Sequence, residues 1–218
     1  IFNTPNLTDG SVYSISISGK DRAGNESNIS IARKIRYDIT APEIEMSFPF
    51  DRTYITTPAI SYSLNEKLSQ GKIIYNYMGG ASDPNAPYEY AMDFGLRQKR
   101  EHRNIFMDDG PDLMEGGVYS ISITGRDRAG NEAEVASVSG VIYDATSPKL
   151  TIQTPDSTLA VNHNRIRFSK NEDLASGTIT WSGTGGKSDS SAPYRINLTD
   201  IELIKGVSEN YTLSNTPQ

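Results

Sequence analysis

The sequence has no cysteine, and it has only one tryptophan and two histidines among its 218 residues. Without cysteine the chain can form neither a disulfide nor a thiolate nucleophile nor a cysteine-ligated zinc site. It also lacks any apolar run approaching the roughly 20 residues that a membrane-spanning helix needs. These absences exclude disulfide-stabilised scaffolds, thiol enzymes and membrane helices within this sequence.

Positive charge is also in short supply. The chain has 21 lysines and arginines against 27 aspartates and glutamates, a net charge of −6 and an isoelectric point near 5.0. An acidic surface repels phosphate backbones and anionic lipid headgroups, so we expect no nucleic-acid partner and no membrane insertion. Only 36% of the residues are hydrophobic and the mean hydropathy is −0.50, which suits small β-sandwiches better than one large core.

What the sequence does contain is an internal repeat. The stretch VYSISI occurs at 12–17 and again at 118–123, and DRAGNE occurs at 21–26 and again at 127–132. Both pairs are 106 residues apart, and the tripeptide NTP recurs at twice that distance. One register without a gap is typical of tandem copies of a single structural unit.

The repeat divides the sequence into three pieces. We expect residues 1–42 to be the C-terminal part of one repeat, 43–148 to be a complete repeat and 149–218 to be the N-terminal part of the next. Because the sequence starts at Ile1 and in mid-repeat, we expect it to be an excerpt of a longer chain. Strands without their sheet partners expose unpaired backbone groups. Neighbouring repeats of the same chain are the favoured partners for the end pieces, and the end pieces of an adjacent chain are the alternative.

The repeat has the patterning of β-strands. Residues 118–124 alternate between apolar and small polar side chains, with several β-branched residues. The turn at 127–131 contains Gly and Asn, which tolerate positive φ, and a second alternating run at 135–143 completes a hairpin. Similar runs occur near 43–48, 59–65, 72–78, 87–92 and 103–107. About seven antiparallel strands in 106 residues predict an all-β fold of tandem immunoglobulin-like β-sandwiches.

Tyrosines mark the expected core of each sandwich. Tyr119 follows the stretch LMEGGV and Tyr13 follows LTDGSV, and both resemble the tyrosine corner, in which the hydroxyl bonds to upstream backbone. Trp181 lies 106 residues after Tyr75, so each copy offers a large aromatic side chain to the core. Tyr62 stands where the first cysteine of antibody domains would. We therefore expect an aromatic cluster in place of the disulfide.

Two short motifs, taken with this repeat, resemble the immunoglobulin-like repeats of large bacterial adhesins and other giant surface proteins. In that family the hairpin between strands F and G carries Asp-x-Ala-Gly-Asn, here at 21–25 and 127–131. The linker reads Asp-x-Thr-Ala-Pro, here at 38–42 and, with Ser147 in place of alanine, at 144–148. The resemblance covers the whole chain. It implies a structural and adhesive stalk of a secreted or cell-surface bacterial protein, with no enzymatic activity.

Two other functions stay open on the sequence. The first is a spacer or glycan-binding module of a secreted hydrolase, in which exposed tyrosines such as Tyr88, Tyr90 and Tyr194 would stack on sugar rings. The second is a subunit of an extracellular filament or sheath that assembles by strand complementation. Catalysis is not expected, because His102 and His163 occupy unrelated places in the repeat, and we expect both at the surface.

The resemblance also implies calcium at the junctions between repeats. The residues that would hold the ion are two linker aspartates and the hairpin residues that accompany them, namely Asp38, Asp144, Asp21, Asp127, Asn25 and Asn131. Calcium takes six to eight oxygen ligands, more than these stretches guarantee, and Asp and Asn also cap tight turns. Both interpretations stay open, and turn capping is favoured. Glu66 and Glu172, which the 106-residue offset links, are likewise expected to serve turns.

One stretch of the complete repeat carries extra positive charge. Its basic residues are Arg97, Lys99, Arg100 and Arg103, whereas the aligned stretch 203–209 reads LIKGVSE. Such a patch would suit an acidic surface glycan or a protein receptor, and loops carry specific binding in many folds. The favoured alternative is a solvated loop, since charge runs usually face water.

Overall fold

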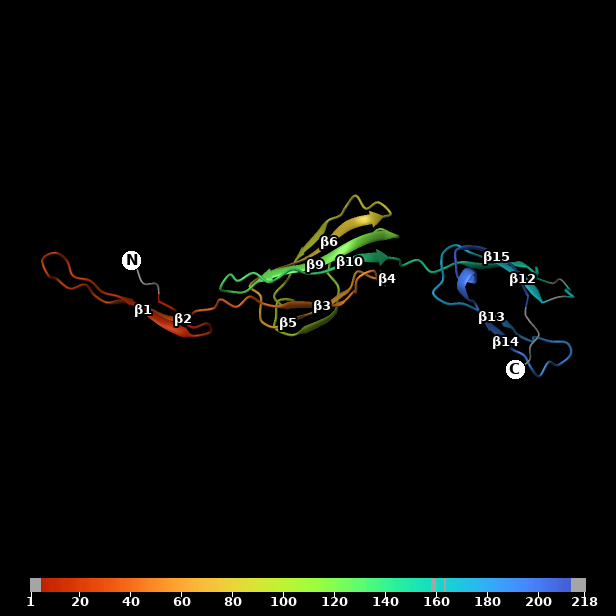
Figure 1. Cartoon of the computed structure of the whole chain (residues 1–218), viewed down its shortest axis with the longest axis horizontal. Coiled ribbons are helices and arrows are strands. Elements are labelled where there is room, and N and C mark those ends of the chain that lie inside the picture. The colour runs from red at the N-terminus through yellow and green to blue at the C-terminus, as the bar shows by residue number, and fades with distance from the viewer. Residues whose placement is uncertain (1–4, 158–159, 163, 213–218) are drawn as a thin grey trace. The chain divides into compact units, whose positions relative to one another are not determined.

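The computed structural model describes residues 5–157, 160–162 and 164–212, and these are almost entirely β-structure (Figure 1). His163 lies outside the described residues. The chain forms two compact units, residues 1–145 and 146–218. The expected fold class is confirmed, because the strands form immunoglobulin-like β-sandwich sheets in tandem. In the described part of the chain, no helix is long and apolar enough to cross a membrane.

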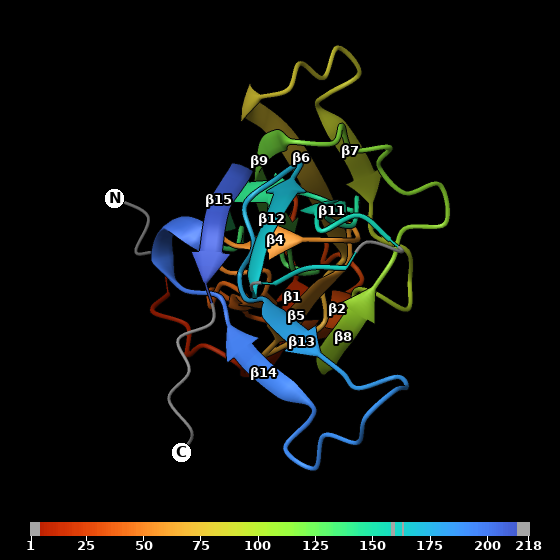
Figure 2. The same cartoon turned by 90° about the vertical axis from the view of Figure 1, so that its right-hand side faces the viewer.

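The first unit contains a hairpin and a complete sandwich. The hairpin consists of β1 (Val12–Ile17) and β2 (Ser30–Arg36). The sandwich strands are β3 (Ile44–Phe48), β4 (Tyr54–Ile55), β5 (Ile60–Leu64), β6 (Gln70–Gly80), β7 (Tyr88–Ala91), β8 (Glu101–Ile105), β9 (Gly117–Arg126) and β10 (Ala136–Tyr143). One sheet has the order β3-β5-β8 and the other β4-β10-β9-β6-β7. Figure 2 shows them end-on, with β6, β7 and β9 above β5 and β8.

The sandwich differs from the expectation by one short strand. After β3 the chain crosses to the opposite sheet, where β4 pairs with β10 in parallel. The backbone N–H of Ile142 donates to Thr53 O at 2.9 Å, and that of Asp144 donates to Ile55 O at 2.9 Å. The expectation of about seven antiparallel strands missed β4, because a strand of two residues is too short to show alternation.

The core between the two sheets is built on alternating apolar positions. The inward residues of β5, β6 and β9 are fully buried, among them Tyr62, Tyr75 and Ile121. The Tyr62 hydroxyl donates to Leu96 O at 2.7 Å, and the Tyr75 hydroxyl donates to Pro58 O at 2.7 Å. Each buried ring therefore keeps its polar end paired, and the aromatic core expected in place of a disulfide is present.

His102 is buried, contrary to the expectation of a surface residue. It is 2% exposed, and its ring stacks on that of Tyr62 with 4.6 Å between centroids and 19° between planes. Its Nε2 atom lies 2.9 Å from Gln98 O. The physical reason is the alternation of β8, in which Glu101 and Arg103 face solvent and the residue between them faces the core.

Both predicted tyrosine corners are present. The backbone N–H of Met114 donates to the Tyr119 hydroxyl at 2.8 Å, and that of Thr8 donates to the Tyr13 hydroxyl at 2.8 Å. The Tyr119 hydroxyl in turn donates to Asp83 Oδ2 at 2.6 Å. The corner of the complete sandwich therefore also holds a buried carboxylate.

The second unit repeats five strands of the first. They are β11 (Leu150–Thr154), β12 (Arg165–Lys170), β13 (Thr178–Trp181), β14 (Tyr194–Asn197) and β15 (Gly206–Thr212), with a 3-10 helix at Asp200–Glu202. One sheet has the order β11-β12-β15, and β13 pairs with β14. Each residue pair of β13 and β14 is a pair of β6 and β7 shifted by 106 positions. The buried core of the second unit consists of Ile166, Phe168 and Leu198, with partly buried apolar side chains packed against them.

Candidate functional site

Each Asp-Arg-Ala-Gly-Asn turn is held by its own aspartate. Asp127 Oδ1 accepts hydrogen bonds from the backbone of Gly130 at 2.7 Å and of Asn131 at 2.9 Å, and its Oδ2 accepts one from the Asn131 side chain at 2.8 Å. Asp21 makes the same bonds to Asn25, from backbone and side chain, both at 2.8 Å. The sequence therefore folds both turns locally, since Asp and Asn side chains pair readily with nearby backbone.

One of these turns also belongs to a group of carboxylates from three parts of the chain. Asp38 follows β2, Glu66 lies in the turn between β5 and β6, and Asp127 follows β9. Each offers an oxygen, and these oxygens all lie within 4.8 Å of one another. The Asn131 side chain donates to Asp38 O at 3.1 Å and so ties the linker to the turn. We name Asp38, Glu66 and Asp127 the junction cluster.

The junction cluster concentrates negative charge. Burial, together with the charges of Asp127 and Asp38, raises the pKa of the Glu66 carboxyl above its ordinary value. The pKa of Asp127 lies below its ordinary value. Burial alone would raise this pKa, but the hydrogen bonds from Asn131 and its neighbours to the carboxylate outweigh the effect of burial. Arg36 offsets part of this charge, with its Nε 3.6 Å from Asp38 Oδ2, and both Arg36 and Lys99 act to lower the pKa of Glu66. Carboxylate oxygens are the donors that a calcium ion prefers.

The structure brings together three of the six metal residues expected from the sequence. Asp38, Asp127 and Asn131 meet at the junction cluster, whereas Asp21 and Asn25 form an exposed turn of their own. Asp144 ends β10, where its backbone N–H pairs with β4. Among the described residues the junction cluster is the only carboxylate group arranged to hold a metal.

Glu66, which the sequence predicts to serve a turn, lies in the turn between β5 and β6, and its carboxylate is the third member of the junction cluster. A signal was present in the sequence, because Glu66 keeps the 106-residue offset to Glu172, together with Asn65, Leu68 and Gly71 of the same turn region. In the second unit Glu172 Oε1 is buried and has no hydrogen-bond partner among the described residues.

With divalent cations removed, Glu66→Gln is expected to raise the thermal midpoint of the first unit by about 1 to 3 °C. The amide keeps the shape of the side chain and removes a charge close to Asp38 and Asp127. Because the folded protein raises the pKa of Glu66, ionised Glu66 opposes folding, and this opposition fades as the pH falls through the folded pKa. The gain should therefore be present at neutral pH and shrink in acid.

Circular-dichroism melts in chelator, at neutral and at acidic pH, check this expectation. Glu45→Gln is the matched control, because Glu45 is exposed on β3 and lies outside the junction cluster. It should leave the midpoint unchanged. A Glu66→Gln chain that melts below the wild type in chelator at neutral pH would show that the three carboxylates do not repel one another.

The four basic residues of the expected patch have different surroundings in the structure. Arg97 is half-buried, and its guanidinium donates to Ser69 O and, at 3.1 Å, to Asp93 O. Arg100 donates to Gly95 O at 3.4 Å. The two remaining basic residues are exposed, Lys99 freely and Arg103 in an ion pair of 2.7 Å with Glu101. The first arginine is thus occupied with backbone, and a receptor contact through all four basic residues stays a prediction.

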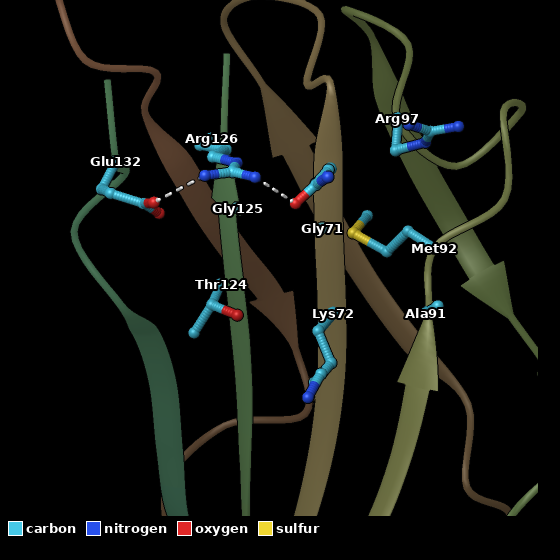
Figure 3. A pocket seen from close by; sticks show the side chains of 10 residues that line it. Gly71, Lys72, Ala91, Met92, Arg97, Thr124, Gly125, Arg126 and Glu132 are labelled. Carbon is cyan, nitrogen blue, oxygen red and sulfur yellow. Dashed lines mark hydrogen bonds and ion pairs between the residues drawn. The ribbon is translucent and has the colours of Figure 1, made fainter. Parts of the chain in front are cut away.

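Arg97 also lines an open pocket of about 580 Å³ at one end of the larger sheet (Figure 3). Arg126 crosses this pocket, where its guanidinium donates to Gln70 at 2.7 Å and lies 3.9 Å from Glu132. Met92 forms the apolar side of the pocket, opposite that ion pair. Of the charged residues that line the pocket, Arg126 pairs with Glu132, Lys72 pairs with Glu89 outside the lining, and Arg97 donates to backbone oxygens.

Two of the three tyrosines considered for sugar stacking belong to the core edge. The Tyr88 hydroxyl donates to Asp112 O at 2.8 Å and to Asp83, and Tyr90 packs edge-on against Tyr75 with 6.4 Å between centroids. Only Tyr194 has a largely exposed ring, at 46%. A flat sugar-binding platform of several rings is therefore not formed by these residues.

Comparison with known proteins adds little to this geometry. No family model matches the chain, and no curated protein matches it. Among solved structures, the crystal structure of chicken CNTN1 FN1-FN3 domains aligns with 95% of this chain and 68% of that chain, at 11% identity and a TM-score of 0.33. The fold assignment above therefore stands on the strand order and register of the chain itself.

Proposed function

We propose that this chain is part of a non-enzymatic array of immunoglobulin-like repeats, a structural and adhesive stalk of a large secreted or cell-surface bacterial protein. In this proposal residues 1–42, 43–148 and 149–218 belong to three successive repeats. The observation that carries the proposal is the junction cluster, in which a linker aspartate meets carboxylates from two loops of the following repeat. A calcium ion held there would join neighbouring repeats and stiffen the stalk.

The linker itself supports a stiff connection. On the side of the β1–β2 hairpin, Asp9 accepts hydrogen bonds from Ile39 N at 2.8 Å and from the Thr40 hydroxyl at 2.6 Å. On the side of the sandwich, Asn65 Oδ1 accepts a hydrogen bond from Glu43 N at 2.9 Å. The linker is thus tied to the preceding hairpin on one side and to the sandwich on the other. A chain segment fixed at both ends has little freedom left to bend.

The second linker repeats these ties. Ala145 N donates to Glu115 Oε2 at 3.0 Å, and Lys149 N donates to Asn171 Oδ1 at 2.6 Å. These four residues are the counterparts, 106 positions later, of Ile39, Asp9, Glu43 and Asn65. The hydrogen bonds at the two ends of the first linker therefore recur at equivalent positions of the second linker, as expected for tandem repeats.

The chemistry of the described residues also favours a structural role. His102, the one histidine they include, packs between Tyr62 and Gln98 inside the sandwich and faces no cavity. The junction cluster consists of carboxylates alone, two of them partly buried and one buried, and such a set of oxygen donors suits ion binding. We accordingly propose a stalk that binds calcium and neighbouring repeats, with its receptor contacts on the loops.

The proposal is tested by thermal unfolding of the whole chain with millimolar calcium and with a chelator. A ligand that binds only the folded state raises stability by about 2.7 kcal/mol at one hundred times its Kd, or roughly 5 to 10 °C here. Glu66→Gln should lose most of this calcium response, although it melts higher than the wild type in chelator. The difference in thermal midpoint between Glu66→Gln and the wild type should therefore be positive in chelator and negative in calcium. This change of sign is expected for a carboxylate that repels the neighbouring carboxylates in the absence of a cation and binds the cation when it is present.

Two results would count against the proposal. A wild-type midpoint that is the same in calcium and in chelator would leave the aspartates as turn caps only. A calcium response that Glu66→Gln retains in full would place the ion elsewhere. Small-angle X-ray scattering in the two conditions provides the test of stiffness, since loss of calcium should broaden the distribution of end-to-end distances.

A further inference from the structure

The open pocket that Arg126 crosses lies on the outer face of the larger sheet (Figure 3). Its lining residues all fall between positions 70 and 132, so the complete repeat forms the pocket alone. Lys72 of β6 lies directly across from Thr124 of β9 and from Ala91 of β7. Two positions earlier on β6, Gln70 lies across from Arg126. Residues opposite each other on paired strands share one face of the sheet, so the pairing gathers two cations, an amide and a hydroxyl in one hollow.

Arg97 adds a third cation to the pocket from the loop after β7. Its guanidinium donates to Ser69 O and, through Nε, to Asp93 O at 3.1 Å. A guanidinium carries five N–H donors, so these bonds leave several of them for other groups. In the part of the chain that the structure describes, no carboxylate forms an ion pair with Arg97. A half-buried positive charge without a negative partner is stabilised by an anion that reaches it.

The second unit shows that the fold does not require a cation at the place of Arg97. Leu68 N donates to Arg97 O at 3.0 Å, and Leu174 N, 106 positions later, donates to Leu203 O at 2.8 Å. Leu203 therefore occupies the place of Arg97, and its side chain packs against the buried core of the second unit. The complete repeat has a guanidinium where an apolar side chain satisfies the same backbone.

The polar residues of β6 differ between the copies in the same way. Thr178 stands 106 positions after Lys72, and Ser176 stands 106 positions after Gln70. The backbone around them is the same, because β13 and β14 keep the register of β6 and β7. The scaffold of the pocket is thus repeated while its charges belong to one copy, which indicates that they serve something other than folding.

The ion pairs at the rim of the pocket are exposed. Arg126 lies 3.9 Å from Glu132, Lys72 lies 2.7 Å from Glu89, and these side chains are between 44% and 70% exposed. Pairs of this kind contribute little to stability, so an incoming anion can replace them at small cost. The lining as a whole carries three cations and one carboxylate, and its balance of charge favours an anion.

We propose that this pocket binds an acidic sugar, a uronic or sialic acid residue of a surface glycan. Arg97 and Arg126 would receive its carboxylate, because the planar guanidinium matches the two carboxylate oxygens. The Thr124 hydroxyl and the Gln70 amide would bond to the hydroxyl groups of the ring, and Met92 would pack against its C–H groups. The site goes beyond the proposed stalk and does not rest on it, since it needs neither calcium nor a second repeat.

The size and place of the pocket favour a sugar over other anions. Its volume of about 580 Å³ lies within the roughly 300 to 1,000 Å³ of small-molecule sites. Extended peptides commonly add as a strand at a free sheet edge, whereas this pocket lies over β6, an interior strand between β9 and β7. The net charge of −6 disfavours nucleic acid. An open hollow also admits the terminal ring of a chain that is attached elsewhere.

NMR titrations of the whole nitrogen-15-labelled chain in chelator test the proposal with three probes. Glucuronate has both the ring and the carboxylate, glucose has the ring alone and acetate has the carboxylate alone. Glucuronate should shift the amide signals of Gly71, Arg97 and Gly125, and it should bind at least about tenfold more tightly than either other probe. Because calcium is absent, a failure of the calcium site would leave this result unchanged.

Variants taken from the second unit identify the residues that bind the carboxylate. Arg97→Leu should melt no lower than the wild type, since Leu203 fills the same place, and it should bind glucuronate at least about tenfold more weakly. Lys72→Thr should weaken binding about threefold. Arg103→Leu is the matched control, because it removes the same charge from an exposed residue outside the pocket, and it should bind like the wild type.

Three results would overturn the proposal. Glucuronate that binds no more tightly than glucose or acetate would show that the pocket does not recognise an acidic ring. Equal affinity of Arg97→Leu and Arg103→Leu for glucuronate would show that the attraction comes from overall charge. A glutamate-rich peptide that shifts the same amides at lower concentration than glucuronate does would make the pocket a site for acidic peptides instead.

Discussion

Replacing Ile121 with alanine is expected to lower the free energy of unfolding of the complete sandwich by about 2 to 5 kcal/mol. Ile121 has no exposed surface and lies on β9 between Tyr75 of β6 and Val138 of β10. Truncation removes three buried carbons and leaves a cavity that the two flanking strands, held in register on both sides, cannot collapse to fill. Denaturant unfolding followed by circular dichroism measures the loss.

The repeat supplies a matched control for this prediction. Ile15 has the same neighbours in sequence, the same strand and the same pairing, but it is 59% exposed. At a concentration at which the chain is monomeric, Ile15→Ala should change stability by less than about 0.5 kcal/mol. Equal losses in the two variants would mean that the hairpin is covered in the monomer.

Tyr119→Phe is expected to cost about 2 to 4 kcal/mol, although it removes a single oxygen. That oxygen accepts the Met114 N–H at 2.8 Å and donates to Asp83 Oδ2 at 2.6 Å. Asp83 is 5% exposed, and after the change the Tyr88 hydroxyl and the backbone of Asn85 and Ala86 would still donate to it. A buried carboxylate that loses one of its donors is among the costliest polar defects.

Acid should reduce this difference between wild type and Tyr119→Phe. Burial raises the pKa of Asp83, but hydrogen bonds from Tyr119, Asn85 and Tyr88 outweigh it, so the pKa lies below its ordinary value of 3.8. A depressed carboxyl pKa contributes stability that is fully present above the ordinary pKa and is lost as the pH falls through the folded one. Urea unfolding from neutral pH down into this acid range should therefore show the two curves converging.

Tyr13→Phe is the control in the other copy of the corner. Tyr13 accepts one backbone hydrogen bond, from Thr8, and no carboxylate contacts it in the described structure. Its replacement should leave the melting of the sandwich unchanged. If Tyr119→Phe proved equally silent, the buried Asp83 would have to be stabilised by its other donors alone.

The sequence predicts well those features that depend on neighbours along the chain. Alternation at 118–124 located β9, and the spacing from Leu113 to Tyr119 located the corner, because both patterns lie within a single strand or turn. The 106-residue offset transferred these assignments to β1 and Tyr13. Local hydrogen bonds and side-chain alternation are encoded within a few residues, so one copy of a pattern is enough to recognise them.

Local sequence patterns do not predict contacts between residues that lie far apart in the sequence. Glu66 joins Asp38 and Asp127 across 28 and 61 positions of the sequence, and no local pattern distinguishes it from a turn residue. Asp83 meets Tyr119 across 36 positions. The expectation of a surface position for His102 is wrong, because the repeat gives no histidine counterpart for this residue and its burial follows from the alternation of β8 and from its contact with Tyr62 of another strand.

The short parallel pair of β4 and β10 determines how the sandwich responds to tension. Because the pair is parallel, a force that enters at the N-terminal end of β4 and leaves at the C-terminal end of β10 slides the two strands past each other along their common axis. The bonds from Ile142 N to Thr53 O and from Asp144 N to Ile55 O are then loaded in shear and must rupture together, whereas an antiparallel hairpin pulled at its open end unzips one bond at a time. The two-residue strand β4 is therefore expected to give the sandwich most of its resistance to a pulling force.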